Sequence, residues 1–96
     1  MPHYVSLIKW TEQGLRTVRE SPKRAEAAMA LAQKMGGRMQ LWYTFGEYDA
    51  VALSEAPSDE VALQIALQLG AQGNVRTTTL KAWSIEEATK VIAKLQ

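Results

Sequence analysis

The chain has 96 residues, of which 47% are hydrophobic and 22% are charged, and its formal net charge is +1. This length predicts a single domain over residues 1–96. The composition excludes a disordered chain and argues against a protein that coats nucleic acid. The absence of cysteine excludes a disulfide framework, a zinc ribbon and a thiol nucleophile. The apolar runs are too short to span a membrane, and no leader segment precedes the first strand-like pattern, so we expect a cytoplasmic protein.

The first half of the chain predicts a strand and then a helix. Residues 4–10 are rich in β-branched and aromatic side chains, which is typical of a strand. Residues 15–20 are short and ambiguous, and they indicate at most one irregular turn. Ser21 and Pro22 then form a favourable helix start, and apolar residues recur at helical spacing. Gly36 and Gly37 are expected to end this helix.

A hairpin is predicted next. Residues 38–45 alternate with period two, which indicates a second strand. Gly46-Glu47 has the form of a two-residue turn with glycine first, and residues 48–55 are expected to return as the third strand.

The second half predicts a helix, a strand and a short final helix. Residues 57–60 place a proline, a capping serine and two acids at a helix start, and Gly70 is a plausible end. The threonine run within residues 75–83 favours a fourth strand. Residues 84–87 have the pattern of a capping box. The apolar face of the helix that follows consists of Ile85, Ala88, Ile92 and Leu95.

This order of elements, β-α-β-β-α-β with an extra C-terminal helix, predicts a ferredoxin-like α+β fold. We expect one four-stranded antiparallel sheet with both long helices on the same face. Strict alternation then divides the strand residues between the two faces. The helix side is predicted to hold Val5, Leu7, Met39, Leu41, Tyr43, Val51 and Leu53. The open side is predicted to hold Tyr4, Ser6, Ile8, Trp10, Gln40, Trp42, Thr44, Tyr48, Ala50 and Ala52.

The open side predicted in this way is too apolar for a solvated sheet face. The simplest cover is a second copy of the chain in a twofold dimer, with a cavity lined by Trp10 and Trp42 between the sheets. The alternative is that the assignment of faces is shifted and these aromatic residues form an ordinary core.

The segment Gly46-Glu47-Tyr48-Asp49 fits the Gly-x-Tyr-Asp signature of the GYD domain family, which this chain resembles. The flanking segments 10–14, 21–24, 55–57 and 73–77 fit as well, so the resemblance extends over nearly the whole chain. The family is similar to the dimeric α+β barrel group, which includes cofactor-independent monooxygenases, stress-responsive barrel proteins and some haem enzymes. The resemblance therefore implies a dimeric α+β barrel. Because the family is largely of unknown function, it supplies no catalytic residues.

Three residues are candidates for catalysis. Asp49 could be a general base or a ligand anchor and Tyr48 a hydrogen-bond donor, because an acid beside a phenol can transfer protons. The alternative is that Asp49 locks the loop that follows the first strand. His3 is the only histidine, and it could be a general base, a haem ligand or an exposed bystander. Without a second histidine or clustered carboxylates, no protein-built metal site is expected.

Further candidates concern binding. Arg24 lies in a basic group at the start of the first long helix, where it could hold an anion or simply be solvated. Trp10, Trp42 and Trp83 are suited both to a ligand pocket and to an interface. We count Trp10, Trp42, Tyr48, Asp49 and Arg24 as candidate ligand-binding residues.

The leading hypothesis is therefore a homodimer, or a larger homo-oligomer, that binds a small hydrophobic or aromatic molecule. It requires no cofactor and has no nucleic acid or membrane partner. One alternative is a cofactor-independent enzyme of the monooxygenase or isomerase kind that uses Tyr48, Asp49, His3 and Trp42. The other is a structural or regulatory oligomer without a ligand.

Overall fold

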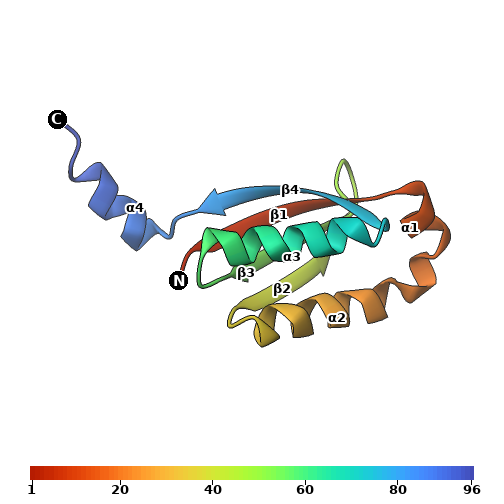
Figure 1. Ribbon diagram of the computed structural model, residues 1–96. Coiled ribbons are helices and arrows are strands. Elements are labelled where there is room, and N and C mark those ends of the chain that lie inside the picture. Colours follow the sequence, from red (N-terminus) through yellow and green to blue (C-terminus); the bar gives the residue numbers. More distant parts are fainter.

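The computed structural model describes residues 1–96 as an α+β fold in two layers (Figure 1). In chain order the elements are β1 (His3–Trp10), α1 (Glu12–Arg16), the 3-10 turn η1 (Val18–Glu20), α2 (Ser21–Lys34), β2 (Arg38–Tyr43), β3 (Ala50–Glu55), α3 (Asp59–Ala71), β4 (Val75–Ala82) and α4 (Ile85–Ile92).

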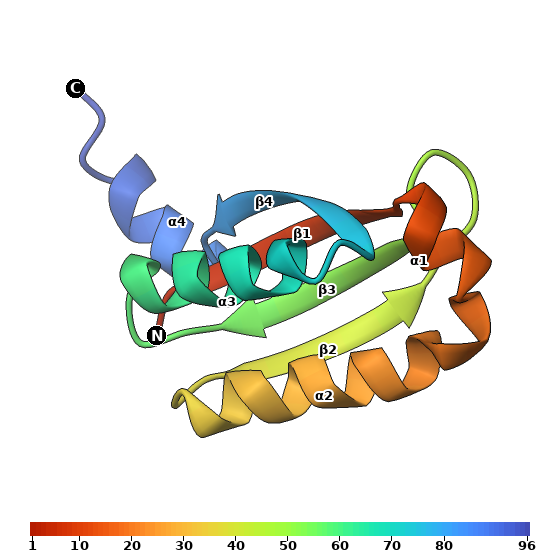
Figure 2. The same ribbon diagram turned by 45° about the vertical axis from the view of Figure 1, so that its right-hand side comes forward.

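The four strands form one sheet in the order β2-β3-β1-β4, and all neighbouring strands are antiparallel. Helices α2 and α3 cover the same face of this sheet (Figure 2). The prediction of a ferredoxin-like fold with an extra C-terminal helix is therefore confirmed. None of the helices has the length and hydropathy needed to cross a bilayer.

The predicted starts of α3 and α4 are confirmed by their capping contacts. Helix α2 begins at Ser21 as predicted, but Ser21 does not cap it, because its hydroxyl is bonded to Tyr43 instead. Pro22 lies in the first turn of α2. The side chain of Ser58 accepts a hydrogen bond from the backbone N–H of Val61 at the start of α3. At α4, Ser84 and Glu87 form a complete capping box, in which each side chain accepts from the backbone N–H of the other. These contacts satisfy backbone donors that a helix start leaves free.

The prediction of a two-residue turn between β2 and β3 is wrong. Strand β2 ends at Tyr43 and β3 begins at Ala50, so residues 44–49 form a wider loop. The loop is wider because Thr44 closes it: its N–H donates to the Asp49 carbonyl at 3.0 Å and its hydroxyl donates to the Tyr48 carbonyl at 2.7 Å. The Asp49 N–H in turn donates to the Ile8 carbonyl of β1 at 2.8 Å. Gly46 has a φ of 112°, a conformation that favours glycine.

The predicted division of the sheet faces is confirmed for β2 and wrong for β1 and β3. The helix side holds the buried residues Tyr4, Ile8, Ala50 and Ala52. Trp10 lies on the same side, because it is two residues from Ile8 along β1. Residues paired directly across an antiparallel ladder share a face. The open face therefore consists of the opposite set, which includes Val5, Leu7, Trp42, Val51, Leu53 and Leu80.

Complementary side-chain volumes account for the arrangement of β1, and β3 follows it because residues paired across the ladder share a face. The face of α2 toward the sheet presents alanines, of which Ala28 and Ala32 are buried, and β3 adds Ala50 and Ala52. Large side chains must fill the space between such small ones, and on β1 these are the aromatic and isoleucine residues of the helix side. No large side chain is completely buried, so the core is thin.

The molecule is long and flat, with extents of 51 × 30 × 18 Å. Its radius of gyration is 14.6 Å, against roughly 12.5 Å for a compact domain of this length. The difference arises in part because α4 extends beyond the end of β4, away from the sheet (Figure 1).

Candidate functional site

A small apolar cleft, which we call the interhelical cleft, lies between α2, α3 and the sheet near the end of β1. Its volume is about 70 Å³. Its lining includes Ile8, Trp10, Ala28, Leu41, Tyr43 and Leu69. A second cavity of about 40 Å³ lies farther along the sheet and shares Ile8, Leu41 and Leu69 with the first. The two cavities therefore form one interrupted apolar space under the helices.

Aromatic and hydroxyl groups lie together in the interhelical cleft. The rings of Trp10 and Tyr43 meet edge to face, with centroids 6.3 Å apart and planes at 89°. The Tyr43 hydroxyl is 2.8 Å from the hydroxyl of Ser21, the first residue of α2. Ser21 is buried, so this pair is a polar group within an apolar wall. The cleft therefore combines an apolar surface with one hydrogen-bonding group, which is the usual composition of a small-molecule site.

Tyr43 and Ser21 were not among the residues expected at a site. The sequence places Tyr43 on the helix side, as observed, but it gives Ser21 only a capping role, which is wrong because the Ser21 hydroxyl bonds to Tyr43. The available signal was their position: Ser21 opens the helix whose alanines line the cleft, and Tyr43 ends the strand beneath it.

Arg24 lines the interhelical cleft, but its guanidinium group is bonded to the chain itself. Nη1 donates to the carbonyl and to the hydroxyl of Thr17, both at 3.1 Å, and Nη2 donates to the Gly14 carbonyl at 3.3 Å. These bonds tie α2 to the preceding turn. The geometry therefore favours an anchoring role for Arg24 over the anion site considered from the sequence.

Asp49 holds the end of β1. Its Oδ2 accepts a hydrogen bond from the backbone N–H of Trp10 at 2.9 Å, and so it positions the residue whose ring lines the cleft. The ring of Tyr48 lies under the ammonium group of Lys9, 5.3 Å from its centroid. Neither Tyr48 nor Asp49 lines the cleft, so the anchoring interpretation of Asp49 agrees with its contacts.

Trp10 and Trp42 lie on opposite faces of the sheet and cannot line one cavity within a chain. Trp42 is paired with Val51 on the open face, where 59% of its surface is exposed. The expectation that Trp10 and Trp42 share the open face is wrong, because the faces of β1 were inverted.

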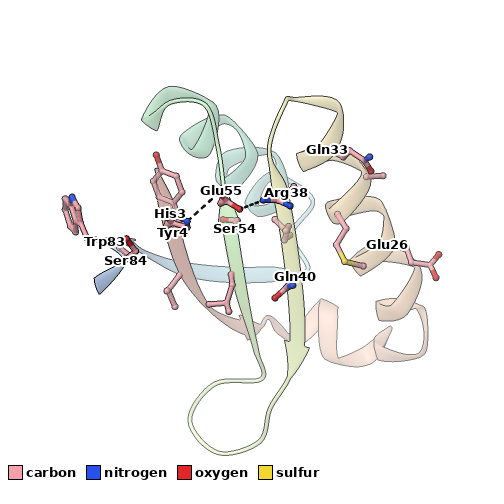
Figure 3. Close-up of a pocket in the computed structure, with 16 residues that line it drawn as sticks. His3, Tyr4, Glu26, Gln33, Arg38, Gln40, Ser54, Glu55, Trp83 and Ser84 are labelled. Carbon is pink, nitrogen blue, oxygen red and sulfur yellow. Dashed lines mark hydrogen bonds and ion pairs between the residues drawn. The ribbon is translucent and has the colours of Figure 1, made fainter. Parts of the chain in front are cut away.

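His3 lies in a wide groove at the far end of the sheet, which we call the terminal groove (Figure 3). The volume of this groove is about 860 Å³, and it extends from Trp83 across the sheet to α2. His3 Nε2 and Arg38 Nη2 approach the two carboxylate oxygens of Glu55 at 3.5 and 3.0 Å. His3 Nδ1 lies 3.5 Å from Glu87 Oε1.

The candidate catalytic residues are not brought together. His3 begins β1 and Asp49 binds its last residue, so roughly 23 Å of strand separates them. No group of three or more histidine or acidic side chains is placed to hold a metal ion.

A polar cluster outside both the interhelical cleft and the terminal groove joins β1, α3 and β4. The hydroxyl of buried Tyr4 donates to Asp59 Oδ1 at 2.5 Å, and the Lys81 ammonium group lies 3.1 Å from the same carboxylate. Burial, together with the adjacent Asp59, raises the pKa of Tyr4 to about 12. The hydrogen bond from Tyr4, with a further one from Lys81, lowers the pKa of Asp59. This cluster fixes the first turn of α3 to the sheet.

Comparison with known proteins agrees with the resemblance described from the sequence. The family model of the GYD domain matches residues 4–92. No curated protein matches the chain.

Proposed function

The chain belongs to the GYD domain family, and we propose that it is a homodimer whose subunits each bind a small, largely apolar molecule in the interhelical cleft. The function of this family is unknown, so the proposal depends on the geometry. One observation carries it: the edge-to-face pair of Trp10 and Tyr43 lies beside the buried hydroxyl of Ser21 in a cleft walled by alanines.

Two features support the homodimer. The chain exposes 6946 Å² of surface, against roughly 5,500 Å² for a folded monomer of this mass. The excess of roughly 1,400 Å² exceeds the ~800 Å² that each partner buries in a standard interface. Part of it lies on the open face of the sheet, where Trp42, Leu53 and Leu80 are exposed. A second copy packed on this face would cover these side chains.

The size of the interhelical cleft defines the class of ligand. Its two cavities of about 70 and 40 Å³ are together somewhat smaller than the ~150 Å³ apolar cavity that admits benzene. A single ring that carries one hydroxyl or amine group would fit after a small outward shift of α2. The ring would contact Trp10, and its polar atom would bond to the hydroxyl pair of Ser21 and Tyr43.

The positions of the ionisable residues favour binding over catalysis. The monooxygenase or isomerase alternative needs an acid or base at the bound molecule, but His3, Tyr48 and Asp49 all lie outside the cleft lining. We therefore propose a binding protein. Its cytoplasmic location stays a prediction.

Ligand binding in the interhelical cleft is tested by NMR, with phenol and indole titrated into the ¹⁵N-labelled protein. We expect saturable shifts of the amide signals of residues around the cleft, such as Trp10 and Ala28. The Ala25→Leu variant fills the cleft from α2 and should weaken binding at least tenfold. Ala27→Leu, an exposed position on the same helix, is the matched control and should bind normally.

Native mass spectrometry of the protein purified from its own host measures stoichiometry and any retained molecule together. A dimer that retains no molecule, binds neither probe and gives equal results for the two leucine variants would contradict ligand binding. It would favour an oligomer without a ligand. A monomer at micromolar concentration would contradict the homodimer.

A further inference from the structure

Helix α4 carries an apolar face that nothing in its own chain covers. Ile85, Ile92 and Leu95 lie on this face, and Trp83 and Val91 lie next to it. Between 57% and 88% of the surface of each of these five residues is exposed. Figures 1 and 2 show α4 at the end of β4, extending outward from the body of the chain. We call residues 83–96 the C-terminal arm.

The arm is attached in a fixed direction. Only Trp83 and Ser84 connect β4 to α4, and Ser84 is held in the capping box with Glu87. Glu87 in turn lies 3.5 Å from His3 Nδ1 on the first residue of β1. To fold back over its own sheet, the arm would have to break the contact between Glu87 and His3. Yet an isolated helix of eight residues is unstable in water unless its apolar face is packed.

The terminal groove offers the matching surface. It has an apolar floor that includes Val5, Met29 and Leu53, and its rim carries charges of both signs at Arg38 and Glu26. Figure 3 shows the root of the arm, at Trp83 and Ser84, on one side of this groove and α2 on the other. Each copy therefore has an uncovered arm beside an empty groove.

We propose that the arm of each subunit lies in the terminal groove of the other, so that two exchanged arms close the homodimer. This inference rests on the dimer proposed above and extends its contact toward α2, because Val5 and Leu53 of the groove floor belong to the open face. A twofold axis makes the two arm-to-groove contacts identical, as a closed dimer requires. The partner's Glu86 and Lys90, on the polar side of α4, can then reach the charges on the rim.

The exchanged arms would bury enough surface for a stable dimer interface. At ~100 Å² for each large apolar side chain, the five exposed residues of one arm remove roughly 500 Å² from water. Two arms and two grooves then bury about 2,000 Å², which is the upper end of the standard range for stable interfaces.

Complementation between two damaged chains tests the exchange. Ile92→Glu damages the arm and Ala30→Lys damages the groove, and both residues are exposed in the single chain, so the fold should persist. By sedimentation, each variant alone should form a dimer at least tenfold weaker than the natural chain. The matched control, Lys94→Glu, changes an exposed residue on the polar side of the arm and should dimerise normally.

An equimolar mixture of the two variants should recover dimerisation as a heterodimer. In a mixed pair, the intact arm of the groove variant meets the intact groove of the arm variant, whereas neither homodimer has an intact contact. Native mass spectrometry distinguishes the three species by mass. If both variants are weak but the mixture stays weak, the arm does not exchange and instead packs on its own chain.

If both variants dimerise like the natural chain, the arm inference is overturned while the proposed dimer through the open face stands. If the natural chain itself is monomeric, both the dimer and the exchange fail. Ligand binding in the interhelical cleft is measured separately and is decided by neither result.

Discussion

Asp49, the last residue of the GYD signature, joins the start of β3 to the end of β1 through both its side chain and its backbone. Its carboxylate accepts the backbone N–H of Trp10, and its own backbone N–H donates to Ile8. The signature residue therefore sets where β1 ends and where the hairpin loop begins. Through Trp10 it also positions one wall of the interhelical cleft, without contacting a ligand itself.

We expect Asp49→Ala to destabilise the fold by about 1–3 kcal/mol, because the Trp10 N–H then loses its acceptor in a half-buried position. Urea unfolding measures this difference. Glu47→Ala, an exposed position in the same loop, is the control and should change little. If Asp49→Asn unfolds like the natural chain yet no longer binds phenol, Asp49 is a ligand residue and our assignment is wrong.

The position of Asp49 beside β1 could be predicted from the sequence, because antiparallel pairing places the start of β3 opposite the end of β1. The partners of Tyr4 could not. A bond between residues 4 and 59 depends on how the first turn of α3 sits above the sheet, and no local pattern encodes that placement.

At the scale of elements, α3 is fixed to the sheet by a contact that depends on pH. The pKa of Tyr4 is raised to about 12 from an ordinary value of 10.0, so the folded state favours the neutral phenol. The resulting stability is complete below pH 10 and is lost as the pH rises from 10 to about 12. The pKa of Asp59 is lowered, so its contribution is present above the ordinary value of 3.8 and is lost as the pH falls below it.

The Tyr4→Phe variant should lose less stability at alkaline pH than the natural chain, because it has no phenol to ionise. We expect its unfolding free energy to fall less steeply between pH 10 and 12 than that of the natural chain, as measured by urea unfolding at each pH. Tyr48→Phe is the matched control and should retain the natural slope. Equal slopes for the natural chain and Tyr4→Phe would show that the contact with Asp59 does not contribute.

The order and type of the elements could be predicted from the sequence, whereas the face of β1 could not be predicted from alternation. Both faces of this strand are apolar, with Val5 and Leu7 on one side and Ile8 and Trp10 on the other. Alternation separates two such sets without saying which lies under the helices. The alanine stripe of α2 was the missing signal, since a wall of small side chains requires large ones opposite.

At the scale of the whole molecule, the open face is apolar as predicted, although the residues of β1 and β3 that form it differ from those predicted. The face carries Trp42, Leu53 and Leu80 in place of most of the expected aromatic residues. The proposed homodimer could not be derived from the sequence of a single chain, because its contacts would lie between copies. What the chain does show is a surface too large and a core too thin for its mass.

Trp42→Glu should weaken the proposed dimer at least tenfold, because it would place a charge in the proposed interface on the open face. The fold of the single chain should persist, since Trp42 is exposed in it. Phe45→Glu in the exposed hairpin loop is the control. Sedimentation equilibrium measures both, and a Trp42→Glu dimer as strong as the natural one would remove the open face from the interface.

The alanine wall under α2 has a mechanical consequence. Alanine has no side-chain torsion beyond its methyl group, so no rotamer change in Ala25, Ala28 or Ala50 can widen or shut the space beside Trp10. Widening the proposed cleft on this alanine side would therefore need a displacement of α2 itself. Such a displacement would be resisted near the start of α2, where Arg24 is bonded to Thr17 and Gly14.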